Sequence, residues 1–201
     1  MKVIAGLGNI GPRYASTRHN AGFLVVQELA RRHAIRIAQA LPSGRSPVAL
    51  IGDGRVAGAV ARLVLPQTMM NLSGEALRWL REWKVDAAEL LLVCDDVNLP
   101  LGQLRARAEG GAGGHHGLMS CFEVLGTEQV PRLRVGVGTT PLPRDLTEFV
   151  VSEFENDERP AIERAIAQAA DACELWAARG VTVMMNRANV RAREDRNEAG
   201  S

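Results

Sequence analysis

The run "LLLVCDD", from Leu90 to Asp96, constrains the fold more than any other feature of the sequence. Five apolar residues stand in a row and two carboxylates follow them. A short apolar run without alternation is typical of a strand that is buried on both faces, as in the middle of a parallel sheet. Substrates bind at the carboxyl ends of such strands. We therefore expect an α/β fold with a site where Asp95 and Asp96 leave the sheet.

Strand and helix patterns alternate along the rest of the chain. Residues 2–7, 35–39, 48–51, 55–65, 103–108 and 132–138 have strand patterns, and residues 20–33, 72–83, 118–125 and 158–179 carry apolar side chains at helical spacing. No Pro/Ser-rich linker divides the 201 residues. This order predicts a single-domain α/β sandwich, residues 1–189, in which helices flank a twisted mixed β-sheet. Residues 190–201 are charged and lack an apolar pattern, which predicts a disordered tail.

Composition narrows the class of protein. The formal net charge is only +1, so a nucleic-acid partner would need a local basic patch. The sequence lacks both an apolar run near the roughly 18 residues of a membrane span and a signal-peptide pattern, so we expect a cytoplasmic protein without membrane contact. Its three cysteines, Cys94, Cys121 and Cys173, are widely spaced and odd in number, which favours buried free thiols over a disulfide framework or a zinc cluster.

The stretch "VIAGLGNIG" contains the glycine pattern of a dinucleotide-binding fold, at Gly6, Gly8 and Gly11. In that fold a helix starts inside the pattern, and an acidic residue about 20 positions later binds the ribose. Here a proline follows Gly11, the helical spacing starts only near Asn20, and the strand pattern "IRIAQ" ends without an acidic residue. We interpret the glycines as a tight turn that places Asn9 in a cleft.

Four blocks follow one another in an order that carries a resemblance. They are "GLGNIGPRYASTRHNAGF", "LPQTMMNLSG", "DDVNLPLGQLRAR" and "GGAGGHHG", with "RLRVGVG" after them. Together they resemble the bacterial-type peptidyl-tRNA hydrolases from about Lys2 to Asn189. The resemblance implies a single α/β domain that hydrolyses the ester between a peptide, or an N-blocked aminoacyl group, and the 3′ ribose of tRNA. It implies no metal or organic cofactor, and we expect a monomer.

The resemblance also implies roles for four residues. His19 matches the general base that activates water, and Asp95 matches the carboxylate that orients the imidazole and stabilises its cation. Asn9, counted with the catalytic group, matches a residue that helps to distinguish a peptidyl group from a free amino acid. Asn71 matches a substrate-binding amide that can donate to the carbonyl. Water attacks directly, since no nucleophilic serine is implied.

Three positions match contacts to tRNA in the family. Tyr14 matches a contact residue, while Arg107 and Arg134 match two basic positions that clamp the 5′-terminal phosphate. A guanidinium group suits that task because it can donate two hydrogen bonds to one phosphate. From their spacing alone, both arginines are also compatible with ordinary solvated charge on strands.

The substrate groove combines one match with two departures from the family pattern. His115 matches a histidine that lines the groove, although a histidine at such a turn is also compatible with a structural role. His116 stands where the family usually has asparagine, and Met69 where an aromatic residue is common. These two changes bear on the affinity for the peptide, and neither alters the pairing of His19 with Asp95.

Three alternatives remain open from the sequence. The chain is also compatible with a non-catalytic RNA-binding member of the family, as the splicing factors of plant organelles are. The residues Asp95, Asp96, His115 and His116 offer nitrogen and oxygen ligands for a catalytic metal. Cys94 is a candidate nucleophile, but its place inside an apolar strand favours an inert thiol.

Overall fold

Seven strands form one mixed sheet in the part of the chain that the computed structural model describes, residues 1–43 and 46–189. They are β1 (Lys2–Gly6), β2 (Gln39–Ser43), β3 (Ser46–Val56), β4 (Ala59–Pro66), β5 (Leu90–Pro100), β6 (Leu104–Arg107) and β7 (Arg132–Gly138), in the spatial order β2-β3-β4-β1-β5-β7-β6. The four central strands β4, β1, β5 and β7 are parallel, whereas β2, β3 and β6 pair antiparallel at the two edges. The predicted mixed sheet is confirmed.

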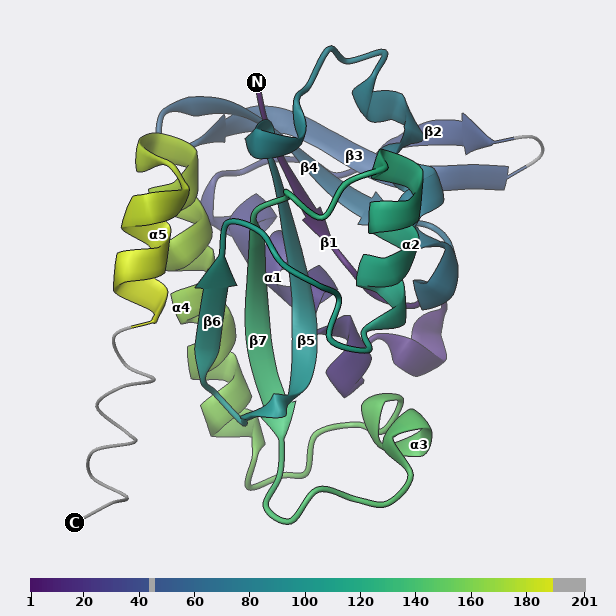
Figure 1. Cartoon of the computed structure of the whole chain (residues 1–201), viewed down its shortest axis with the longest axis vertical. Coiled ribbons are helices and arrows are strands. Elements are labelled where there is room, and N and C mark those ends of the chain that lie inside the picture. Colours follow the sequence, from purple (N-terminus) through teal and green to yellow (C-terminus); the bar gives the residue numbers. More distant parts are fainter. Residues whose placement is uncertain (44–45, 190–201) are drawn as a thin grey trace.

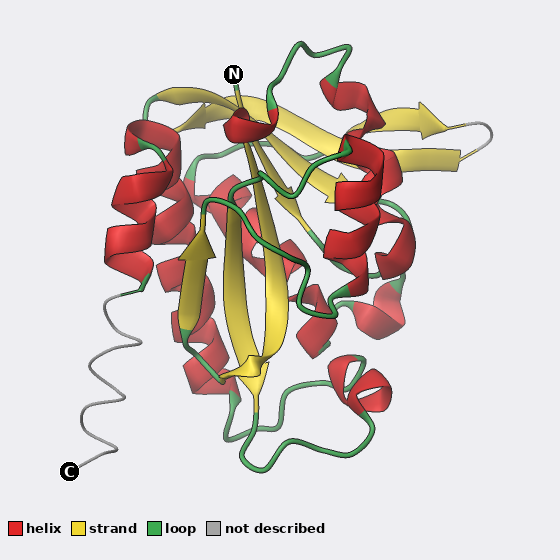
Figure 2. Ribbon diagram, viewed as in Figure 1, coloured by secondary structure: helices red, strands yellow, loops and turns green. Residues whose placement is uncertain are grey.

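Helices cover both faces of this sheet (Figures 1 and 2). The helices α1 (Ala21–Arg32), α4 (Arg159–Arg179) and α5 (Val181–Ala188) lie on one face, and α2 (His116–Leu125) lies on the other with the 3₁₀ helix η3 (Met70–Leu80). The short helices are η1 (Pro12–Tyr14), η2 (Arg18–Asn20), η4 (Ala87–Glu89) and α3 (Leu146–Val150), the last of which lies beyond the end of β7. None of the helices described is long and apolar enough to cross a membrane.

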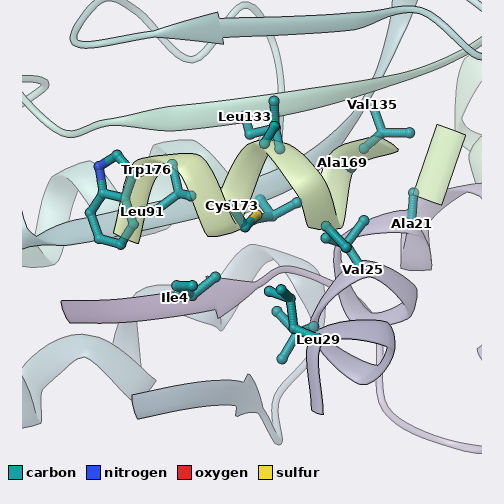
Figure 3. Packing of buried hydrophobic residues seen from close by; sticks show 14 of the residues in the cluster. Ile4, Ala21, Val25, Leu29, Leu91, Leu133, Val135, Ala169, Cys173 and Trp176 are labelled. Carbon is teal, nitrogen blue, oxygen red and sulfur yellow. The ribbon is translucent and has the colours of Figure 1, made fainter. Parts of the chain in front are cut away.

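The apolar run in β5 is continuous because both faces of this strand are covered. Leu91 and Val93 pack against α1 and α4, while Leu90, Leu92 and Cys94 pack against α2 and η3. Figure 3 shows the first layer, in which the buried side chains Trp176 and Cys173 of α4 lie close to Leu91. Each large apolar side chain buried in this way stabilises the fold by about 1.5–3 kcal/mol. Burial of these apolar side chains therefore holds β5 in place without a contribution from its polar residues.

Several boundaries differ from the sequence prediction. Residues 35–38 are a loop and the strand begins at Gln39, while residues 55–65 contain the end of β3, a turn at Ala57 and Gly58, and β4. Residues 56–61 are all small and apolar, so no polar residue marks the turn in the sequence. The helix α5 was not predicted, and the predicted tail, residues 190–201, lies outside the described residues.

The predicted helix at residues 72–83 is instead the 3₁₀ helix η3. Its buried residues are Met70, Ser73, Gly74, Ala76, Leu77 and Leu80, whereas Leu72, the first residue of the predicted helix, is exposed. Gly74 packs directly against the backbone of α2 at Ser120. Close packing against α2, which helical spacing does not reveal, accompanies the tighter winding.

The glycine pattern of the first loop has a packing role. A Cβ at Gly6 would lie 2.3 Å from the carbonyl oxygen of Gly22, and a Cβ at Gly22 would lie 2.3 Å from the carbonyl oxygen of Val93. Helix α1 therefore contacts β1 and β5 backbone to backbone. Gly11 has a φ of 105°, so it also supplies the left-handed turn that follows Asn9.

We expect Gly22→Ala to destabilise the fold by about 1–3 kcal/mol or more, because the added methyl group must displace backbone atoms. Helix propensity alone predicts the opposite, a gain of up to about 1 kcal/mol. Urea denaturation measures the free energy of unfolding. Gly111→Ala is the control, because a Cβ there meets nothing within 4 Å. Equal stability of the Gly22→Ala and Gly111→Ala variants would contradict the packing role.

Candidate active site

A cavity of about 460 Å³ opens at the carboxyl edge of the parallel strands. The loops after β1 and β4, the end of β5 and the loop before α2 all contribute to it. Its lining includes eight of the ten predicted site residues: Asn9, His19, Met69, Asn71, Asp95, His115, His116 and Arg134. Tyr14 on η1 and Arg107 at the end of β6 are not among the lining residues. The structure thus brings together in one cavity residues that are up to 125 positions apart, from Asn9 to Arg134.

His19 and Asp95 form the pair expected from the sequence. His19 lies on η2, and its Nδ1 donates a hydrogen bond of 2.8 Å to Asp95 Oδ1. The side chain of His19 is 13% exposed and that of Asp95 is 2% exposed. Within the described part of the chain Nδ1 is the bonded ring nitrogen, so Nε2 is left as an acceptor that faces the cavity. This arrangement fixes the orientation of the imidazole.

The pKa of Asp95 is below its usual range. Burial by itself raises this pKa, but the charge interaction with His115 and the hydrogen bonds from His115 and His19 outweigh it. Asp95 is consequently ionised at neutral pH, and an ionised carboxylate stabilises the imidazolium that forms when His19 takes up a proton.

His115 and His116 are neighbours in sequence with different surroundings. His115 is buried: its Nε2 lies 3.0 Å from Asp95 Oδ1, and its Nδ1 accepts a hydrogen bond from the backbone N–H of Leu118, which caps α2. His116 is exposed at the first position of α2 and lines the cavity. His115 thus lines the cavity, as expected, but both of its ring nitrogens bond to protein atoms.

Asn9 is held so that its amide nitrogen is left for the cavity. The Asn9 side-chain oxygen accepts a hydrogen bond of 2.8 Å from the backbone N–H of Met70. Asn20, which was not predicted as a site residue, fixes the Asn9 backbone by accepting from its N–H and donating to its carbonyl oxygen. Because Oδ1 is occupied, Asn9 offers an N–H donor to a bound group. Asn71, at the start of η3, is exposed on the same cavity.

Arg134 and Arg107, which we expected to clamp one phosphate together, have different surroundings in the structure. Arg134 is buried, with hydrogen bonds from its guanidinium group to Asp96 at 3.1 Å and to the carbonyl oxygens of Gly111 and Ala112. Arg107 is exposed, and its partner across the strand pair is Arg132. Arg134 therefore holds the glycine-rich loop, and Arg107 is the more accessible of the two guanidinium groups.

The geometry of the cavity argues against both the metal alternative and the cysteine alternative. Asp96 bonds to Arg134 and His116 is exposed, so these two do not complete the proposed ligand set. His19, Asp95 and His115 bring possible ligand atoms within 4.8 Å of one another. However, His19 Nδ1 and His115 Nε2 both lie at hydrogen-bond distance from Asp95 Oδ1. Burial raises the pKa of the Cys94 thiol, which disfavours a thiolate nucleophile.

One wall of the cavity was not predicted at all. It is formed by Leu146, Thr147, Val150 and Val151, in and after α3. This wall is tied to the histidine segment by Arg18, which is buried and donates to Glu158 at 2.5 Å and 3.1 Å and to Ser152 at 3.3 Å. The guanidinium group of Arg18 also lies over the Phe149 ring, 4.4 Å from its centre.

Comparisons with known proteins agree with this geometry. The family model described as peptidyl-tRNA hydrolase matches residues 3–197. The chain is 44% identical to the peptidyl-tRNA hydrolase of Roseiflexus castenholzii, covering 100% of this chain and 92% of the relative, and 44% identical to that of Syntrophomonas wolfei, covering 94% and 100%. A crystal structure of peptidyl-tRNA hydrolase from Acinetobacter baumannii superposes with a TM-score of 0.85 at 30% identity, covering 94% of this chain and 95% of that one.

An oriented imidazole, a buried carboxylate and amide groups around one cavity are groups that suit an ester hydrolase, here on an α/β fold. The chain belongs to the peptidyl-tRNA hydrolase family, which cleaves the ester bond of peptidyl-tRNA and releases the tRNA. The resemblance of the four sequence blocks is confirmed.

We expect Glu158→Gln to destabilise the protein by about 3 kcal/mol at pH 7, because Arg18 then remains buried without its counter-charge. Burial raises the pKa of Glu158, but the hydrogen bonds from Arg18 and from the Glu155 backbone N–H, together with the charge of Arg18, lower it by more. The unfolded chain therefore binds more protons, so this contribution is present above about pH 4.5 and is lost as the pH falls through the lower folded-state value.

Urea denaturation between pH 3 and pH 7 measures this contribution. The acid dependence should be weaker in Glu158→Gln than in the wild type. Glu75→Gln is the matched control, since Glu75 forms a more exposed ion pair with Arg78 on η3, and such surface pairs contribute roughly 0–1 kcal/mol. If both variants lost the same stability, the buried ion pair of Arg18 and Glu158 would contribute no more than a surface ion pair.

Proposed function

We propose that this enzyme hydrolyses peptidyl-tRNA by direct attack of water, with His19 as the general base and Asp95 as its orienting partner. The observation that carries the proposal is the 2.8 Å hydrogen bond from His19 Nδ1 to the buried Asp95. It fixes the tautomer in which Nε2 accepts a proton. It also places a negative charge beside the ring that must become a cation.

In this mechanism, water gives its proton to His19 Nε2 as its oxygen bonds to the ester carbonyl carbon. Negative charge then builds on the carbonyl oxygen, where the amide groups of Asn9 and Asn71 are suited to donate hydrogen bonds. The tetrahedral intermediate collapses by breaking the bond to the ribose oxygen, which takes the proton back from the imidazolium. The route needs no metal or organic cofactor, because His19 supplies both proton transfers.

The peptide part of the substrate is proposed to lie against the apolar wall. Met69 is 40% exposed, and Leu146 and Val151 are exposed to a similar degree. A flexible methionine and aliphatic side chains contact many different peptide side chains without requiring one shape. His116, exposed at the rim, offers one donor and one acceptor where the family has an asparagine amide.

The acceptor end of tRNA is proposed to lie along β6 and β7. In the antiparallel register Arg105 faces Arg134 and Arg107 faces Arg132, so four arginines share one face of the sheet. Arg134 and Arg132 are buried and bonded to the loop that precedes α2. We assign the 5′-phosphate contact to the exposed Arg107, with Tyr14 as a further contact. Action on tRNA favours the cytoplasm, and the monomeric state stays a prediction.

We expect His19→Ala to lower kcat by roughly 10²–10⁴-fold while the protein stays folded, because a general base contributes about that factor. Asp95→Asn should also be slow, since an amide does not stabilise the imidazolium. Hydrolysis of N-acetyl-aminoacyl-tRNA measures both variants. His33→Ala is the control, because His33 bonds to Glu174 on the helical layer outside the cavity. A His19→Ala variant with near wild-type kcat would remove the proposed mechanism.

We expect Arg107→Ala to raise KM about tenfold for a tRNA minihelix bearing a 5′-phosphate, with little change in kcat, because a hydrogen bond to a charged group is lost. The same minihelix without this phosphate should show nearly the same KM with both proteins. Arg164→Ala, which removes an exposed arginine of α4, is the control. Equal losses on both substrates would assign Arg107 to general attraction of the RNA.

A further inference from the structure

Both ring nitrogens of His115 are bonded within the protein. Nδ1 accepts from the Leu118 backbone N–H at 3.2 Å, so this nitrogen carries no proton. Nε2, which then carries the proton, lies 3.0 Å from Asp95 Oδ1. The capping bond of α2 thereby selects the tautomer of His115 that donates to Asp95. This role differs from direct contact with the substrate.

One oxygen of Asp95 accepts from two imidazoles. His19 Nδ1 is 2.8 Å and His115 Nε2 is 3.0 Å from the same Oδ1, and the two rings lie 5.1 Å apart at a tilt of 48°. A carboxylate oxygen that already accepts one hydrogen bond attracts a second donor less strongly. The bond from His115 therefore reduces the charge that Asp95 presents to His19.

Resting on the proposed role of His19, we propose that His115 is a positioning residue of the active site, which holds Asp95 Oδ1 and shares its negative charge so that His19 stays neutral until it takes the proton of water. Without this second donor, Asp95 would favour the imidazolium of His19 before the reaction starts. The enzyme would then lose its base at a higher pH.

Other charged groups near His19 do not replace this effect. Asp96, next to Asp95, forms an ion pair with Arg134. Arg18, next to His19, forms one with Glu158 of the loop before α4. His116 lines the cavity from the start of α2 and is exposed to water. Among the described residues, Asp95 and His115 are therefore the groups that bear most directly on proton uptake by His19.

Two conservative variants separate the two bonds of His115. The amide oxygen of asparagine lies near the place of Nδ1, so His115→Asn keeps the cap of α2 and loses the donor to Asp95. The amide nitrogen of glutamine lies near the place of Nε2, so His115→Gln keeps the donor and loses the cap. The pH dependence of kcat/KM for N-acetyl-aminoacyl-tRNA, from pH 5 to pH 9, and thermal melting are measured for both variants.

We expect the acid limb of the profile to move up by about half to one pH unit in His115→Asn, as for the loss of one hydrogen bond to a charged group. Its melting temperature should also fall, because the buried carboxylate of Asp95 loses one of its two donors. His115→Gln should keep the wild-type acid limb and melt at a lower temperature. If both variants shifted the acid limb equally, the proposal would be wrong, because the shift would not depend on the donor to Asp95. If neither variant shifted it, the proposal would also be wrong, and His115 would be a helix cap only.

Imidazole NMR tests the same point without catalysis. The chain has four histidines, so few resonances need assignment, and His33→Ala and His116→Asn identify two of them. In the wild type we expect the Nε2–H tautomer for His115 and the Nδ1–H tautomer for His19. An Nδ1–H tautomer for His115 would overturn the proposal even if His115→Asn did not fold.

Following the imidazole NMR signals of His19 as the pH is changed distinguishes this proposal from the proposed function. Proton uptake by His19 should move to higher pH in His115→Asn and stay in place in His115→Gln, whether or not His19 is the base. Near wild-type activity of His19→Ala would instead remove the proposed mechanism and leave the coupling through Asp95 measurable.

Discussion

The active site depends on one buried negative charge, the carboxylate of Asp95. Placing an ion in the interior costs several kcal/mol unless it is paired and hydrogen-bonded. The two donors to Asp95 Oδ1 come from opposite layers of the sandwich, His19 from the connection between β1 and α1 and His115 from the loop before α2. Satisfying this charge therefore joins the two layers at Asp95, in the middle of β5, and the same bonds that stabilise the carboxylate orient the imidazole of His19.

The segment that carries His19 is fixed from several sides. The backbone contacts of Gly6 and Gly22 bring the start of α1 against β1 and β5, and η2 immediately precedes that start. On the other side, the ion pair of Arg18 with Glu158 attaches η2 to the segment that follows α3. The imidazole thus needs little freedom of its own, which suits a base that must meet one water in one geometry.

Local patterns predicted what depends on local structure. The apolar run before Asp95 predicted a central strand and a site at Asp95, although the strand continues to Pro100. The pairing of His19 with Asp95 was implied by the family resemblance and not by a local pattern. What failed depends on contacts between distant residues. Strand alternation gives the face on which Arg134 lies but not the loop that covers it, and nothing local shows that Arg18 meets an acid 140 positions away. For the same reason, the close packing of η3 against α2 was invisible in helical spacing.

A general base must be neutral before the reaction and cationic during it, and a buried carboxylate serves only the second requirement. If Asp95 acted on His19 alone, its charge would favour the cation at all times. The adjacent histidines at the start of α2 show how the fold meets both requirements. The capping geometry turns His115 inward to Asp95 and leaves His116 exposed, so one position contacts the carboxylate and the next faces the cavity. In the proposed mechanism, the start of a helix, which first secures the fold, thereby also sets the charge that His19 experiences.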